Sequence, residues 1–178
     1  NLTQRMVRSL RQSGRESLTI APETGTDALR LRCGKPFTNG QILDKLEMAR
    51  NEGMKKVKLY FMVGLPNETD EDVLAIASLA GTIRRELRMG VSLSVNAFVP
   101  KPRTPWGQQA FIGIRGADKR FQLLRRELSE NQGKGVEARF SSPREADLEY
   151  RLSWAGPEAL DWMEKLVEKR KRRNNNAI

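Results

Sequence analysis

The chain has 178 residues, of which 32 are Lys or Arg and 22 are Asp or Glu, so its formal net charge is +10. This length is enough for one domain with a core of its own. The single cysteine and the lack of histidine exclude a disulfide framework within the chain, and we expect no metal site in it. We find no secretory signal and no apolar run near about eighteen residues, so we expect a cytoplasmic chain that does not cross a membrane.

The positive charge is unevenly placed, and every residue from Lys169 to Arg173 is basic. Such a run is able to contact nucleic-acid phosphates, but no aromatic residues are interleaved with it as stacking platforms. We therefore favour a solvated helix end over a nucleic-acid interface. At the other end, Asn1 opens directly into helix-like sequence, and we expect the chain to be part of a longer protein.

Strands and helices alternate along the first two thirds of the chain. The apolar periods predict strands at 17–21, 57–63 and 91–99, and helices at 2–10, about 41–52, 73–87 and 117–131. Thr38 with Gln41 and Thr69 with Asp72 are cap signatures at two helix starts. The strand starts are 40 and 34 residues apart, which is the size of a βα unit. This spacing predicts parallel strands with covering helices.

The pattern changes after residue 115. A short edge strand is expected at 136–140, and helices are expected at 143–154 and 157–172. We therefore divide the chain into a βα array over residues 1–115 and a C-terminal appendage over residues 116–178. The appendage combines helices, the edge strand and the basic tail.

Each predicted strand has an apolar face and a smaller or more polar face. The second set is Ser17, Thr19, Ala21 and Glu23 in the first strand, Lys58, Tyr60 and Met62 in the second, and Ser92, Ser94, Asn96 and Phe98 in the third. Parallel strands covered on both faces are usually apolar throughout, so this face predicts a hollow that holds water or a ligand. An antiparallel sheet with one face in water would alternate in the same way, but the intervening helices favour parallel crossovers.

The three strands end in segments that combine Gly or Pro with polar side chains, at residues 21–25, 63–69 and 99–105. In α/β folds, ligands bind where the carboxyl ends of parallel strands meet. We therefore expect a binding site where these three segments converge.

These stretches resemble the radical S-adenosylmethionine (radical SAM) enzymes, in the second half of their partial (β/α) barrel. "LYFMVGLPNETDEDV", residues 59–73, is similar to the motif of the family's fifth strand; "SLTIAPETGTDALRLRCGKPFT", residues 17–38, and "SVNAFVPKPRTPW", residues 94–106, are similar to the fourth and sixth strands. The closest likeness is to cobalamin-binding-domain-linked members and to methylthiotransferases. The resemblance implies an α/β fold: half of a radical SAM barrel, with about three parallel βα units and a helical appendage.

The resemblance also implies polar contacts to S-adenosylmethionine. Glu23 and Thr24 fall where the family contacts the ribose or the amino-acid part of the cofactor, and Lys35 falls at a basic position that many relatives share. A solvated loop lysine is an equal alternative for Lys35. Glu68 either supports its loop near the N-terminus of the next helix or touches the ligand, and we favour the first role.

The expected adenine contacts lie on the other two strands. The backbone of Val63, Gly64 and Leu65 falls where the family's fifth strand lies along the adenine, and Gly64 would permit that close approach. Phe98 and Val99 match the sixth-strand contacts.

One departure from the family concerns the Cys-x-x-x-Cys-x-x-Cys loop that binds its [4Fe–4S] cluster. This loop is absent, and Cys33 alone cannot hold a cluster. We expect the loop upstream of Asn1 in the intact protein, and with it an upstream cobalamin domain in the cobalamin-linked branch. The predicted function is thus part of a radical SAM iron–sulfur oxidoreductase that generates a 5′-deoxyadenosyl radical. We assign no catalytic residue and expect this chain alone to be inactive.

Two alternatives stay open. A methylthiotransferase acting on RNA or protein would suit the basic tail, although those enzymes usually end in a small β-barrel, and residues 143–172 look helical. A noncatalytic RNA-binding module would bind RNA with a steep salt dependence and ignore S-adenosylmethionine. The half barrel of the leading prediction leaves a strand edge open, which invites self-association.

Overall fold

The structure, a computed structural model, describes residues 2–132, 135–157, 159–164 and 167–168. Its four strands form one sheet in the order β1-β2-β3-β4, and every pairing is parallel. The strands are β1 (Ser17–Glu23), β2 (Lys56–Val63), β3 (Gly90–Ala97) and β4 (Val136–Phe140). The helices are α1 (Gln4–Gln12), α2 (Asp27–Arg32), α3 (Asn39–Asn51), α4 (Asp70–Glu86), α5 (Gly113–Glu127) and α6 (Pro143–Trp154), with a π-helical turn at Leu128–Gln132. This arrangement confirms the predicted α/β class and is consistent with a partial (β/α) barrel.

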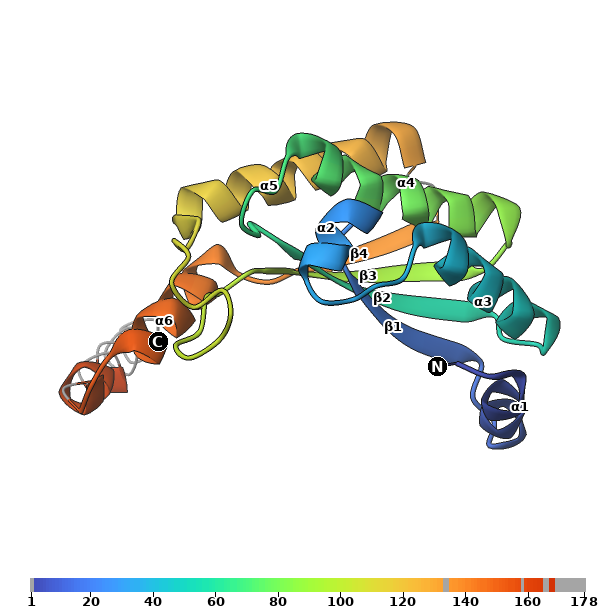
Figure 1. Ribbon diagram of the computed structural model, residues 1–178, viewed down its shortest axis with the longest axis horizontal. Coiled ribbons are helices and arrows are strands. Elements are labelled where there is room, and N and C mark those ends of the chain that lie inside the picture. The colour runs from blue at the N-terminus through green and yellow to red at the C-terminus, as the bar shows by residue number, and fades with distance from the viewer. Residues whose placement is uncertain (1, 133–134, 158, 165–166, 169–178) are drawn as a thin grey trace, which may run out of the picture.

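Helices cover only one face of the sheet. Figure 1 shows α2 to α5 on that face, the other face bare, and α1 and α6 at opposite ends of the molecule. Burial alternates accordingly along β2 and β3. The buried, helix-facing set is Val57, Leu59, Phe61, Val63, Val91, Leu93, Val95 and Ala97. The predicted division of the strands into two faces is therefore confirmed, and the parallel pairing excludes the antiparallel alternative.

Hydroxyl side chains fix where the helices begin after the strand loops. Thr38 and Thr69 each accept the backbone N–H three residues on, and the side chains of Gln41 and Asp72 accept the N–H of the cap residues in return. Both predicted cap signatures are thus confirmed as capping boxes. Thr26 caps α2 in the simpler way, through one bond to the N–H of Leu29.

Two elements differ from the predicted ones, and one predicted helix is described only in part. The structure adds α2 between the first strand and α3; six residues are too few for a helical period to be read from the sequence. Helix α5 begins at Gly113 rather than near residue 117. Of the helix expected at 157–172, residues 159–164 and 167–168 are helical, whereas residues 158, 165–166 and 169–178, with the basic tail, lie outside the described residues.

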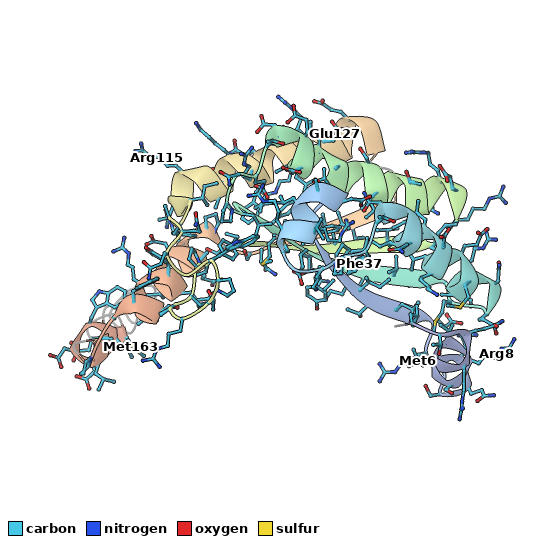
Figure 2. The ribbon with its side chains drawn as sticks, viewed as in Figure 1. Met6, Arg8, Phe37, Arg115, Glu127 and Met163 are labelled. Carbon is cyan, nitrogen blue, oxygen red and sulfur yellow. The ribbon has the colours of Figure 1, made fainter. Side chains whose placement is uncertain are left out.

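Helix α1 is attached to the array by polar contacts. Arg8, labelled in Figure 2, donates from Nε to the Glu52 carboxylate at 2.8 Å, just beyond the end of α3. Val7 on the same helix is fully buried. No helix among the described residues is long and apolar enough to span a bilayer.

Backbone contact between the loop after β1 and helix α4 depends on a glycine. A Cβ at Gly25 would lie 2.5 Å from the backbone nitrogen of Ile76, and closer still to the carbonyl oxygen of Asp72. These atoms belong to the backbone of a helix and cannot rotate away. Only glycine therefore lets the β1 loop lie directly against α4.

We expect Gly25→Ala to lower the free energy of unfolding by about 3 kcal/mol, the upper end of the usual cost of overpacking. Urea unfolding followed by circular dichroism measures this loss. Gly40→Ala is the matched control, because a Cβ at that position of α3 would meet only the Thr38 hydroxyl, at an ordinary 3.6 Å. Equal stability of the two variants would show that the loop does not rest on α4 as described.

Candidate cofactor-binding site

The segments after β1 and β3 and the end of β2 meet around one pocket of about 410 Å³. Its lining comes from the end of β1, the connection between α2 and α3, the end of β2, and the segment between β3 and α5. The lining residues are Glu23, Arg32, Cys33, Gly34, Lys35, Met62, Phe98, Val99, Lys101, Thr104, Pro105 and Trp106. Four of the predicted site residues, Glu23, Lys35, Phe98 and Val99, are thus brought together at the carboxyl edge of the sheet.

Glu23 and Lys35 form an ion pair on one wall of the pocket. A bulge between Ile20 and Glu23 breaks the register with β2, and Glu23 has a positive φ of 70°, which is rare for a residue with a side chain. Lys35 Nζ donates to the Glu23 carboxylate. It also donates to the carbonyl of Ala21, at 2.9 Å. The bulge and the two hydrogen bonds from Lys35 fix the Glu23 carboxylate on the pocket wall.

Hydrogen bonds from the buried Arg30 side chain hold the connection that carries this pair. The Arg30 side chain is fully buried, and all five of its N–H groups donate. The acceptors are the carbonyls of Pro22, Thr24 and Phe37 and the side-chain oxygens of Asp27 and Asn39. Burial lowers the pKa of the Arg30 guanidinium, while the Asp27 carboxylate opposes that shift. Sequence reasoning missed Arg30, because an arginine in a polar loop carries no sign that it is buried.

Thr24 lies below the pocket rather than on its lining. Thr24 is 1% exposed, and its hydroxyl donates to the Thr26 carbonyl at 3.1 Å. Contact between Thr24 and a ligand stays a prediction.

The predicted residues of the β2 loop also lie behind the lining. Val63 and Leu65 are buried. Gly64 has φ 82°, and a Cβ there would lie 2.7 Å from Cγ2 of Ile112, so this glycine admits a neighbouring side chain. Whether the same backbone also lies along a ligand stays a prediction. Arg32 connects this loop to the pocket, since its Nη2 donates to the Pro66 carbonyl at 2.8 Å.

Glu68 holds the β2 loop from inside. Its side chain is 3% exposed, and it accepts the Gly64 N–H at 2.7 Å. Arg120 of α5 lies 3.4 Å from the same carboxylate and donates to the Glu68 carbonyl at 3.0 Å. Burial raises the pKa of Glu68 to about 7, because the loss of hydration outweighs the Gly64 hydrogen bond and the Arg120 charge. These contacts support the loop; a direct contact between Glu68 and a ligand stays a prediction.

The third wall is aromatic. Phe98 and Trp106 meet edge to face, with ring centroids 5.6 Å apart. A Cβ at Gly107 would lie 2.5 Å from the Lys101 carbonyl, so the segment turns sharply just after Trp106. Sequence reasoning placed this segment at the site but did not single out Trp106. Its position eight residues after Phe98, among three prolines, was the available signal.

Helix α6 contacts both ends of the aromatic segment, residues 100–111. The Trp154 indole donates to the Pro100 carbonyl at 3.4 Å, and Lys101 Nζ donates to Ser153 at 2.8 Å as well as to Glu149. Tyr150 stacks on Phe111, with centroids 5.1 Å apart. Residues 100 and 111, at the two ends of the segment, are therefore both held by α6.

The charged side chains around the pocket are mostly cations. Arg32, Lys35 and Lys101 line it together with one carboxylate, Glu23. Burial and the Glu23 charge raise the pKa of the Cys33 thiol, which disfavours its thiolate. Among the residues that the structure describes, no group of three His, Cys, Asp or Glu side chains is placed to hold a metal ion. The pocket suits a polar ligand with an anionic group and an apolar or aromatic part.

The raised pKa of Glu68 predicts a pH dependence of stability. The folded state binds the Glu68 proton more tightly than the unfolded chain, so stability falls as pH rises from about 4.5 through about 7. A shift of this size corresponds to about 3 kcal/mol. Glu68→Gln keeps an acceptor for the Gly64 N–H and should remove that slope.

Urea unfolding at several pH values between these limits measures the slope in the wild-type chain and in the variant. Glu71→Gln, which changes an exposed acid on the first turn of α4, is the control and should leave the slope in place. A wild-type slope that survives Glu68→Gln would contradict the assignment.

Comparison with known proteins agrees with the geometry. The sequence model of the radical SAM superfamily matches residues 1–80, which include β1, β2 and the loops after them. The uncharacterized protein MJ0966 of Methanocaldococcus jannaschii is 42% identical over 96 residues, which cover 54% of this chain and 21% of that protein. The chain therefore matches about a fifth of the length of this relative. Residues 1–80, less than half of the 178 residues, are thus similar to the radical SAM superfamily.

Proposed function

We propose that the pocket at the carboxyl ends of the strands binds S-adenosylmethionine, as part of a radical SAM iron–sulfur oxidoreductase. The observation that carries the proposal is the convergence of Glu23, Lys35 and Phe98 on one pocket in a chain with a radical SAM segment. These residues come from two separate stretches of sequence, 17–38 and 94–106, and the parallel sheet brings them to one edge. The specific reaction and the activity of the intact protein are part of this proposal.

The pocket lining matches the chemistry of this cofactor. S-adenosylmethionine carries a carboxylate, an ammonium group, a sulfonium centre, a ribose and an adenine. The carboxylate would lie against Lys35, Arg32 or Lys101, and the Glu23 carboxylate would attract the cationic groups. Phe98 and Trp106 offer aromatic surface for the adenine.

In radical SAM enzymes, the bound cofactor supplies a 5′-deoxyadenosyl radical after one-electron reduction by a [4Fe–4S] cluster. Such a cluster is held by several thiolates, and Cys33 is the single cysteine of this chain. The residues present therefore do not fit the cluster, whose ligands would come from elsewhere in the intact protein. A cobalamin partner has no support here beyond the sequence resemblance.

The part of this chain in such a reaction is positioning. The Glu23–Lys35 pair and the aromatic wall would hold the two ends of the cofactor, so its reactive carbon would be presented in one orientation. The segment 100–111, held at both ends by α6, would limit access of water from its side. A reactive radical needs both orientation and exclusion of solvent.

The two alternative functions have less support. Helix α6 follows the sheet where a methylthiotransferase would usually carry strands of a small barrel. The noncatalytic RNA-binding alternative depends on the basic tail, which lies outside the described residues. A pocket lined by four of the nine residues expected from the radical SAM resemblance favours the cofactor-binding proposal over both.

We expect the 178-residue chain to bind S-adenosylmethionine, and Lys35→Met and Phe98→Ala each to weaken binding about tenfold, or about 1.4 kcal/mol. Isothermal titration calorimetry gives the dissociation constants. Lys119→Met is the control, because it removes one positive charge from an exposed position on α5, away from the pocket. The proposal fails if the wild-type chain does not bind, or if the control weakens binding as much as the pocket variants do.

A second expectation concerns the support from α6. Tyr150→Ala removes the ring that stacks on Phe111, and aromatic pairs contribute about 1 kcal/mol. We expect it to weaken S-adenosylmethionine binding about fivefold, whereas Tyr150→Phe keeps the stack and should bind as the wild type does. The same calorimetric titration, with thermal melts to show that both variants are folded, tests this. Equal affinity of the two variants would mean that α6 does not position the pocket wall.

A further inference from the structure

We propose that the open face of the sheet binds an anionic group of the enzyme's substrate, a carboxylate or a phosphate, between Lys58 and Arg139. This inference rests on the proposed function, because it takes the open face to be the side on which the substrate meets the cofactor. It names a substrate class, which the family match leaves open.

The register places polar side chains of three strands in rows across this face. Tyr60 lies opposite Ser94, and Ser94 opposite Arg139. The row before it, toward the amino ends of the strands, contains Lys58, Ser92 and Glu137. Side chains in these rows are half-buried or exposed, since no helix covers them. The face is therefore a continuous polar surface that a ligand can reach.

The Lys58 ammonium lies against the ring of Tyr60, which shares its row with Arg139. Lys58 Nζ is 4.7 Å from the centroid of that ring. Arg139 enters the same row from β4, two strands away. In register, Ser94 of β3 therefore lies between the strand of Lys58 and Tyr60 and the strand of Arg139.

Neither cation is neutralised within the described part of the chain. Arg120, Lys35 and Lys101 each form an ion pair, whereas Lys58 and Arg139 form none with any described carboxylate. The acid on this face that lies nearest to Arg139 along the sheet is Glu137. It lies on the edge strand β4, two residues before Arg139. Two cations without an ion pair, with Ser94 on the strand between them and Tyr60 beside Lys58, form an arrangement that suits a carboxylate or a phosphate.

This surface is continuous with the proposed cofactor pocket. Met62, two residues after Tyr60 on the same face of β2, belongs to the pocket lining. Successive side chains on one face of a strand are about 7 Å apart. A substrate whose anionic group lies between Lys58 and Arg139 would therefore extend toward the pocket. Several covalent bonds of the substrate would separate its reacting carbon from the anionic group.

The test uses the 178-residue chain and three small probes: pyrophosphate, glutarate, and 1,5-pentanediol as the uncharged counterpart of glutarate. Titrations are followed by amide NMR shifts at Tyr60, Ser94 and Arg139, at low salt because exposed charges are screened. We expect pyrophosphate or glutarate to shift these signals and the diol to leave them unchanged. The stronger anion identifies the group as a phosphate or a carboxylate. No shift with either anion would overturn the inference.

Charge-removing variants locate the site. Lys58→Met and Arg139→Met should each weaken anion binding about tenfold, and Lys58→Gln guards against a packing effect of Met. Arg115→Met is the matched control, because Arg115 projects from the start of α5, on the helix-covered side (Figure 2). Equal weakening by the control would mean attraction to net charge and would overturn the inference.

S-adenosylhomocysteine binding, measured on the same proteins, separates this inference from the proposed function. We expect all of these variants to bind it as the wild type does, since none of the changed residues lines the pocket. If S-adenosylhomocysteine binds and the anions do not, the substrate inference is wrong and the cofactor site stands. If the anions bind and S-adenosylhomocysteine does not, the cofactor proposal is wrong, and with it the assignment of this anion site to a radical SAM substrate.

Discussion

The buried guanidinium of Arg30 is the interaction on which the pocket depends most. A charged group removed from water is costly unless its hydrogen bonds are replaced, and here each N–H has an acceptor. The acceptors come from the end of β1, from α2 and from the start of α3, so one side chain fixes three segments relative to one another. The connection that presents Glu23 and Lys35 is therefore rigid without an apolar core of its own.

A second constraint is the one-sided cover of the sheet. With all neighbouring helices on one face, β2 and β3 bury one set of side chains and leave the other set accessible. The accessible set is free to be polar, because it is not needed for the core. The same alternation that makes the fold stable thus also supplies a surface for a ligand, with the loops at its carboxyl edge forming the pocket.

The elements could be predicted from the sequence where they are long and periodic. The strands, α3 and α4 carry clear apolar periods and cap signatures, and the structure confirms them. The short helix α2 was missed, because six residues that include Arg30 and Arg32 show no apolar stripe. Its stability comes from tertiary contacts, which sequence periodicity does not record.

The site was predictable at the level of segments rather than side chains. Strand ends could be located from Gly64 and the prolines, and parallel pairing then forces them to one edge. Which side chains line the pocket depends on rotations that the sequence does not state: Thr24 turns inward, and Trp106 turns onto Phe98. The contribution of α6 depends on a contact between Tyr150 and Phe111, which are far apart in the chain.

The pocket and the open face are connected through Met62, and this has a consequence for specificity. The pocket lining contains cations and one acid that are partly engaged with each other or with nearby backbone, as Lys35 is with Glu23 and Arg32 with Pro66. Lys58 and Arg139 form no ion pair among the described residues, although Lys58 lies against the Tyr60 ring. An anionic ligand would therefore compete with a bound carboxylate in the pocket but not on the open face. That difference favours a cofactor of mixed charge in the first and an anionic substrate group on the second.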